Sequence, residues 1–135
     1  MGLTPFRIYL DSCIAIYLVE EHQAFAAKTE TLLENRPDAV LFISDLTVME
    51  CLVGPFRSGN RPLEEKFNAW FGAVTVLPIT NIAVLEAARL RANHPTLKTP
   101  DALHLATALH HSCDEFWTND TRLDHVVPSF VRNIL

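Results

Sequence analysis

Apolar and polar residues follow one another along this chain in two periodic patterns. Short apolar runs predict buried strands, and stretches with apolar residues three or four positions apart predict helices. The run 6–10 stops at Asp11, and a helical pattern follows through Ile14, Tyr17 and Leu18. By the same criteria we expect strands at 6–10, 39–43, 74–77, 115–118 and 130–135, further helices at about 23–35, 44–53, 63–71, 82–92 and 99–111, and a short helix beginning at 119–120.

Local signals mark several ends of these helices. Ser44 is placed to cap the helix that follows the second strand, and Thr99 to cap the helix that starts at Pro100. Gly54 and Pro55 interrupt the pattern of the helix after Ser44. Strands and helices therefore alternate throughout, which predicts an α/β fold of three layers. Its centre would be a short parallel sheet of about five strands with helices on both faces.

Composition and charge exclude only a few classes of fold and function. A chain of 135 residues, 49% of them hydrophobic, predicts a single domain over 1–135. The three cysteines form an odd set without a close-spaced pair, which favours a reducing, cytoplasmic location over a disulfide framework. We find no signal peptide or membrane-spanning run and expect no membrane partner. A formal charge of −5 argues against a broadly basic surface that coats nucleic acid, although it does not exclude a nuclease.

Four carboxylates fall where chemistry is expected in such a fold. In an open parallel sheet, ligands bind beyond the carboxyl ends of the strands. Asp11 and Asp120 follow predicted strands directly, Asp101 lies in the first turn of its helix, and Glu50 lies in the helix entered from the second strand. Each aspartate alone is more simply explained as a helix cap or a first-turn residue.

Glu50 is harder to explain as an ordinary surface residue. Its helical neighbours Leu46 and Val53 place it beside the stripe expected to face the core, where an unpaired carboxylate would be costly. A glutamate at the edge of the stripe that reaches water is the simpler alternative. Four converging carboxylates would repel one another unless cations compensate, and an all-oxygen donor set suits Mg²⁺ or Mn²⁺.

Three segments carry a resemblance to a known family. They are Ile8–Ser12, Ile43–Glu50 and Thr99–Ala108, the last followed by Thr118-Asn119-Asp120. In this order and spacing they resemble PIN-domain ribonucleases and, within them, the VapC-type toxins of type II toxin-antitoxin systems. The resemblance covers nearly the whole chain. Cys13 departs from it, because an apolar residue or asparagine is common at that position.

The resemblance implies a function and a set of site residues. Asp11, Glu50, Asp101 and Asp120 match the acidic positions that bind Mg²⁺ or Mn²⁺, and Ser12 and Asn119 match polar positions that assist them. The implied reaction is metal-dependent hydrolysis of RNA phosphodiester bonds by water. The implied partners are an RNA substrate, a VapB-like antitoxin and a second copy in a homodimer.

Several other residues and functions have simpler or competing explanations. His104 is more simply a hydrogen-bonded helix histidine than a catalytic base. Lys98 and other basic residues could guide RNA, but ordinary surface charge explains each of them as well. The aromatic stripe 63–71 is more often core than a partner groove. A catalytically silent PIN-like protein or RNA interaction module is the main alternative. A phosphatase ranks low because Cys13 stands where it needs a second aspartate. A receiver domain ranks low because the late strand 115–118 offers no lysine.

Overall fold

The computed structural model describes residues 4–135 and contains the predicted alternation of strands and helices. The order is β1 (Phe6–Leu10), α1 (Ser12–Val19), α2 (Phe25–Glu34), β2 (Ala39–Ser44), α3 (Asp45–Ser58), α4 (Arg61–Phe71), β3 (Thr75–Leu77), α5 (Asn81–Asn93), α6 (Thr99–His110), β4 (Glu115–Thr118), the 3-10 helix η1 (Thr121–Leu123) and β5 (Val131–Asn133).

The strands form one five-stranded sheet in the order β3-β2-β1-β4-β5, with every neighbouring pair parallel. The predicted α/β class and parallel sheet are therefore confirmed. Strand β1 lies in the centre, pairing with β2 along one edge and with β4 along the other. The chain runs outward from β1 through β2 to β3 and then returns to the opposite edge. Ligands bind at such a reversal of strand order, here between β1 and β4.

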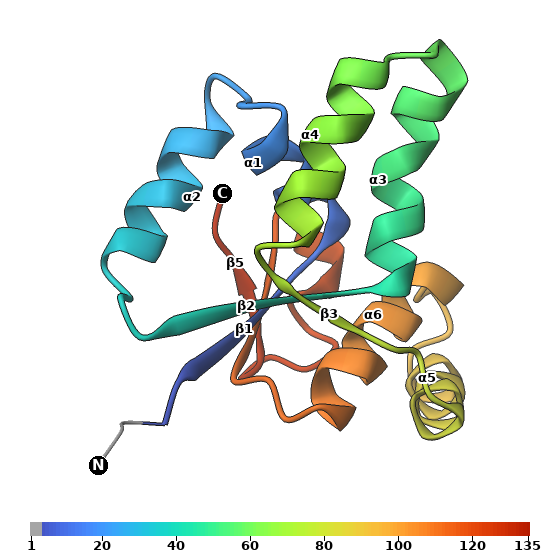
Figure 1. The fold of residues 1–135 in the computed structure, drawn as a ribbon. Helices are drawn as coiled ribbons and strands as arrows, with labels where there is room; N and C mark the ends of the chain where they lie inside the picture. The colour runs from blue at the N-terminus through green and yellow to red at the C-terminus, as the bar shows by residue number, and fades with distance from the viewer. Residues whose placement is uncertain (1–3) are drawn as a thin grey trace.

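Helices cover both faces of the sheet, as Figure 1 shows, with α1 to α4 on one side and α5 and α6 on the other. The two faces use alternate residues of the same strands, because successive side chains in a strand point in opposite directions. In β1, Ile8 and Leu10 join the core beneath α1 and α2, whereas Tyr9 joins the core beneath α5 and α6. Helix α4 adds the fully buried Phe67, so its aromatic stripe packs mainly inward.

Helix α3 differs from the prediction in two ways. It does not stop at Gly54 and Pro55 but continues to Ser58 and ends at Gly59, whose φ of +65° places it in the left-handed region. Its buried residues are Thr47, Cys51 and Pro55, whereas Val53 is exposed. The expected core-facing stripe of Leu46 and Val53 is therefore wrong, because the helix is rotated so that the Thr47 side meets the sheet.

The start of α6 also differs by one residue. Lys98 is the N-cap and Thr99 is already helical, so Pro100 lies in the first turn as expected but Thr99 is not the cap. Such a shift is common at helix ends. Asp101 keeps its predicted place in the first turn of α6.

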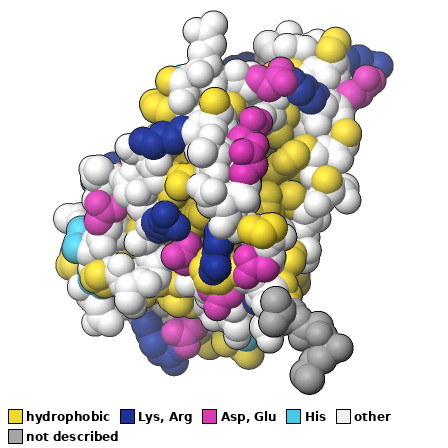
Figure 2. Space-filling model, turned by 90° about the vertical axis from the view of Figure 1, so that its left-hand side faces the viewer, with side chains coloured by type: hydrophobic (Ala, Val, Ile, Leu, Met, Phe, Trp, Pro, Cys, Tyr) yellow, Lys and Arg dark blue, Asp and Glu magenta, His cyan; other side chains and the backbone are white. Residues whose placement is uncertain are grey.

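The surface carries mixed charge. Figure 2 shows acidic and basic side chains interspersed on one face of the molecule. Within residues 4–135, none of the helices is both long enough and apolar enough to cross a membrane.

Candidate active site

Asp11 is held at the junction of β1 and β4. It caps α1, where its Oδ1 accepts a hydrogen bond from the Ser12 N–H at 2.8 Å. Its Oδ2 accepts a hydrogen bond from the Thr118 hydroxyl, also at 2.8 Å, and the Asp120 N–H donates to that same hydroxyl oxygen at 3.0 Å. Thr118 is fully buried at the end of β4. This threonine therefore ties the carboxylate that follows β1 to the backbone that follows β4.

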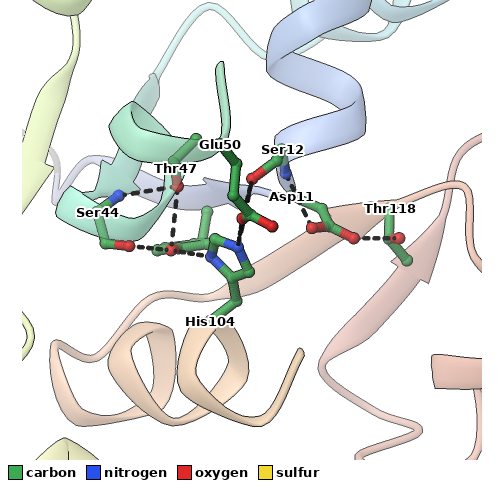
Figure 3. Close-up of polar contacts among 8 residues, drawn as sticks. Asp11, Ser12, Ser44, Thr47, Glu50, His104 and Thr118 are labelled. Carbon is green, nitrogen blue, oxygen red and sulfur yellow. Dashed lines mark hydrogen bonds and ion pairs between the residues drawn. The ribbon is translucent and has the colours of Figure 1, made fainter. Parts of the chain in front are cut away.

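Ser12 connects Asp11 to Glu50, as Figure 3 shows. Its backbone N–H binds Asp11, and its hydroxyl donates to Glu50 Oε1 at 2.7 Å. Because Ser12 follows Asp11 in the first turn of α1, one residue orients two acids from different elements. This is the assisting position that the family resemblance implied for Ser12.

His104 holds Glu50 from the other side. Its Nε2 lies 2.5 Å from Glu50 Oε1, and because an ionised carboxylate only accepts hydrogen bonds, this nitrogen donates. Its Nδ1 lies 2.7 Å from the hydroxyl of Tyr9, which in turn lies 2.8 Å from Ser44 Oγ. The side chains of His104 and Tyr9 are almost completely buried. A buried hydrogen-bond chain thus runs from the ends of β1 and β2 to Glu50 (Figure 3).

These contacts determine the ionisation of Glu50. Burial alone would raise its pKa, but the hydrogen bonds from His104 and Ser12 outweigh burial, so the pKa is lowered from its ordinary value. Both hydrogen bonds go to Oε1, and within residues 4–135 the other oxygen, Oε2, has no hydrogen-bond donor. Glu50 is therefore an oriented carboxylate with one oxygen left for another ligand.

Asp101 has the opposite environment. Burial raises its pKa first, and the nearby charges of Asp11 and Asp120 raise it further, while His104 and Arg122 offset part of this effect. The charges of Asp11, at the β1–α1 junction, and of Asp120, at the β4–η1 junction, are therefore close enough to act on Asp101 in α6. Uncompensated negative charge of this kind is what a divalent cation neutralises.

Asp120 already has a cationic partner. Arg122 Nη2 donates to its Oδ2 at 2.6 Å, and Arg122 Nε donates to its Oδ1 at 2.9 Å, so the guanidinium binds both oxygens. These hydrogen bonds lower the pKa of Asp120. Sequence reasoning did not single out Arg122, since its spacing from Asp120 is ordinary for a surface pair. The only available signal in the sequence was that Arg122 stands two residues after Asp120, the cap of a short helix.

The side chain of Asn119 binds a residue of α1 rather than one of the acids. Its Nδ2 donates to the hydroxyl of Tyr17 in α1 at 2.7 Å, so its amide ties the β4–η1 junction to α1. Its predicted role in assisting the carboxylates is therefore indirect in this structure. His104 is a buried, hydrogen-bonded helix histidine, as the simpler interpretation of the sequence predicted. Tyr9 and Thr118 lie within the family motifs, but no supporting role was predicted for them.

The donor set fits a hard divalent cation in its chemistry. The side chains are carboxylates, without a thiolate or a free imidazole among them, which matches Mg²⁺ or Mn²⁺ better than zinc. Within residues 4–135, however, no three His, Cys, Asp or Glu side chains are already arranged to hold a metal ion. One of the four acids, Asp120, forms an ion pair with Arg122 instead.

Comparison with known proteins identifies the family. The model of the PIN domain matches residues 8–127. The chain belongs to the PIN domain family. No curated protein matches this PIN domain by sequence. Members of the family are generally nucleases, and the resemblance that the sequence motifs indicated is confirmed.

Solved structures extend the comparison. A chain of the toxin-antitoxin complex from Klebsiella pneumoniae is 26% identical, covers 95% of this PIN domain and 98% of its own length, and has a TM-score of 0.77. The VapBC2 complex of Rickettsia felis, bound to a promoter DNA fragment, gives a TM-score of 0.76 at 15% identity over 93% and 97% of the two chains. VapC20 of Mycobacterium tuberculosis, described as a toxin that cleaves the sarcin-ricin loop, gives 0.73 at 16% identity over 89% and 95%.

Proposed function

We propose that this PIN domain is a Mg²⁺- or Mn²⁺-dependent endoribonuclease and the toxin of a type II toxin-antitoxin pair. Asp11, Glu50, Asp101 and Asp120 would bind the metal. The observation that carries the proposal is the geometry in which Ser12 joins two acids, with its N–H on Asp11 Oδ1 and its hydroxyl on Glu50 Oε1. Burial and the neighbouring charges of Asp11 and Asp120, which raise the pKa of Asp101, support it. A cluster that repels itself in the absence of a cation is suited to binding one.

The residues around the acids prepare them for this task. Thr118 and the Ser12 N–H fix the Asp11 carboxylate, while Ser12 Oγ and His104 fix Glu50. Such supporting hydrogen bonds orient carboxylates before a metal arrives and reduce the reorganisation that binding requires. A bound Mg²⁺ or Mn²⁺ would supply activation of water and stabilisation of charge on the scissile phosphate.

RNA is the proposed substrate because of the family and one structural relative. VapC20 of Mycobacterium tuberculosis cleaves the sarcin-ricin loop, a segment of RNA, and shares the fold of this chain. We extend RNA cleavage, but not that particular target, to this protein. A cytoplasmic location follows from the same proposal, because that is where the substrate would be met.

A VapB-like antitoxin is the proposed partner. Similar chains occur in toxin-antitoxin complexes, such as the one from Klebsiella pneumoniae. Met49, Val53 and Phe56 form an exposed apolar stripe at helical spacing on α3, with exposed fractions of 54%, 40% and 62%. Apolar surface of this kind marks interaction sites. Because Glu50 directly follows Met49, an antitoxin segment on this stripe would lie beside the acidic site. A homodimer is proposed from the resemblance alone.

RNA cleavage with defined metals tests the proposal. Purified protein is incubated with a panel of structured and single-stranded RNAs in Mg²⁺, in Mn²⁺ or in chelator. We expect cleavage only with metal, and a loss of at least about a hundredfold in rate for Asp101→Asn and Asp11→Asn. Each substitution keeps the shape of the side chain and removes its charge.

Asp45→Asn is the matched control, because Asp45 is an exposed aspartate in the first turn of α3 and does not contact the site. It should cut as the unchanged protein does. If folded protein cuts no RNA with either metal, or if the Asp101 and Asp11 variants remain fully active, the nuclease assignment is wrong. The alternative, a catalytically silent interaction module, then becomes the better explanation.

A further inference from the structure

A cavity of about 310 Å³ adjoins the acidic cluster, between the start of α6 and η1. Asp101 and Arg122 form part of its wall, so the cavity and the cluster share residues. Its size is at the lower end of the range for small-ligand sites. None of the roles given above to the carboxylates and their supporting residues explains why a hollow should lie here.

Two cationic side chains line the cavity together with the carboxylate of Asp101. Lys98, the N-cap of α6, and Arg122 both line it, and both lower the pKa of Asp120. Asp120 binds Nε and Nη2 of Arg122, which keeps that cation at the cavity and leaves Nη1 as the guanidinium nitrogen that is not bonded to this carboxylate. Lysine and arginine in such a position bind phosphate oxygens.

The remaining wall is aromatic and apolar. The rings of His94 and His125 pack edge to face with their centroids 5.9 Å apart. Leu123 and Val126, which are 2% and 8% exposed, provide buried apolar surface beneath them. A planar ring with an apolar floor is the environment that proteins use to stack an unpaired nucleobase.

We propose that this cavity binds one nucleotide of the RNA substrate beside the cleavage site. The base lies against His94 and His125, and the phosphate lies between Lys98 and Arg122. This inference rests on the proposed function and adds a property of the substrate. Because a base must leave its helix to enter a cavity, the nucleotide bound here is unpaired.

Binding of mononucleotides tests the site without catalysis. The imidazole resonances of the unchanged protein are followed by NMR in chelator while each of the four nucleoside 5′-monophosphates is added to about 10 mM. We expect at least one nucleotide to shift the resonances of His94 and His125, and those of His110 to stay in place. Inorganic phosphate is the comparison probe. If no nucleotide shifts these rings, or if phosphate alone shifts them equally, the cavity is not a nucleotide site.

Cleavage kinetics provide the second measurement. The double variant His94→Ala/His125→Ala should raise KM about tenfold, in keeping with the loss of one stacked base, and should change the base preference next to the cut. His110→Ala is the control, since His110 lies at the far end of α6. An unchanged KM and base preference would overturn the assignment.

The two proposals fail in different ways. Nucleotide binding without any metal-dependent RNA cleavage would remove the proposed function and leave the binding site. If the protein cleaves RNA with metal but binds no nucleotide, and if the double variant acts as the unchanged protein does, the nucleotide site is wrong and the nuclease assignment stands.

Discussion

Single residues in this site have opposite electrostatic environments. Glu50 accepts two hydrogen bonds and its pKa falls, whereas burial and two neighbouring aspartates raise the pKa of Asp101. Ionised Glu50 is therefore compatible with the folded metal-free protein, but ionised Asp101 is costly to it. The Asp101 carboxylate makes the cluster suitable for a cation, but it reduces the stability of the protein when no cation is bound.

Asp101→Asn should stabilise the metal-free protein at neutral pH. A pKa raised in the folded state means that the folded protein binds the proton more tightly than the unfolded chain, so this group favours folding below its ordinary pKa. As the pH rises through the raised pKa, that advantage turns into a cost, which asparagine does not have. Urea unfolding in chelator at neutral pH should show a higher midpoint for Asp101→Asn than for the unchanged protein. As the pH is lowered towards 4, the difference between the two midpoints should change in favour of the unchanged protein.

Addition of Mg²⁺ or Mn²⁺ provides the control. Ligands that bind only the folded state stabilise it by mass action, so the metal should raise the midpoint of the unchanged protein and have much less effect on Asp101→Asn. A variant that is less stable in chelator at neutral pH would show that repulsion around Asp101 is unimportant.

Thr118→Val should destabilise the protein by about 1–3 kcal/mol. Valine has nearly the same shape as threonine but lacks the hydroxyl, so the buried Asp11 oxygen loses a donor and the Asp120 N–H loses an acceptor. Unfolding in urea measures the change. Thr75→Val, at an exposed position of β3, should change stability by less than about 0.5 kcal/mol. Equal effects at the two sites would contradict a special role for Thr118.

At the scale of elements, sequence patterns located strands better than the faces of helices. Strands β1 and β4 have the predicted bounds, and each is followed directly by a polar residue, Asp11 after β1 and Asn119 after β4. For α3 the spacing of Leu46 and Val53 suggested the wrong buried face. Apolar residues occur on several sides of this helix, and only its packing against the sheet decides which side is buried.

The residues of the site were predicted only where the family motifs assign them a role. The four acids and Ser12 belong to recognisable segments. The contact of His104 with Tyr9 and Glu50 joins residues from β1, α3 and α6, and no local pattern encodes a distance between separate elements. The binding of Arg122 to Asp120 depends on side-chain conformation, which spacing does not determine.

Gly59→Ala should destabilise α3 and its turn by about 1–2 kcal/mol. Gly59 ends the helix in a left-handed conformation with φ of +65°, which costs this amount for residues that have a Cβ atom. Nothing within 4 Å would clash with the added methyl group, so the effect should be conformational. Thermal or urea unfolding gives the value. Ser58→Ala, one residue earlier on the exposed surface, should stay within about 0.5 kcal/mol of the unchanged protein.

Across the whole molecule, charge is mixed and the net charge is −5. Acidic and basic side chains alternate over the face shown in Figure 2. A protein of this kind cannot rely on a wide basic surface to hold RNA. The proposed recognition at one cavity with two cations, Lys98 and Arg122, therefore predicts weak dependence on salt.

RNA binding should lose little affinity as salt rises. For single strands, the slope of log K against log salt is roughly −0.7 for each phosphate neutralised, so two cations give about −1.4. Fluorescence anisotropy with a labelled 2′-O-methyl oligonucleotide, which resists cleavage, measures this slope between low and physiological salt. Lys98→Gln should make it shallower, and Lys28→Gln, an exposed lysine on α2, should not. A slope several times steeper would indicate a broad basic footprint.

Because β1 lies in the centre of the sheet, both of its neighbouring strands, β2 and β4, are synthesised after it. Asp11 is synthesised before β4, the strand that completes its surroundings, and the bond from Thr118 spans 107 residues. The first three quarters of the chain hold Asp11, Glu50 and Asp101 without the threonine and aspartate that complete the site. A chain that stops before Thr118 therefore lacks two residues of the proposed metal site and its supporting hydrogen bonds.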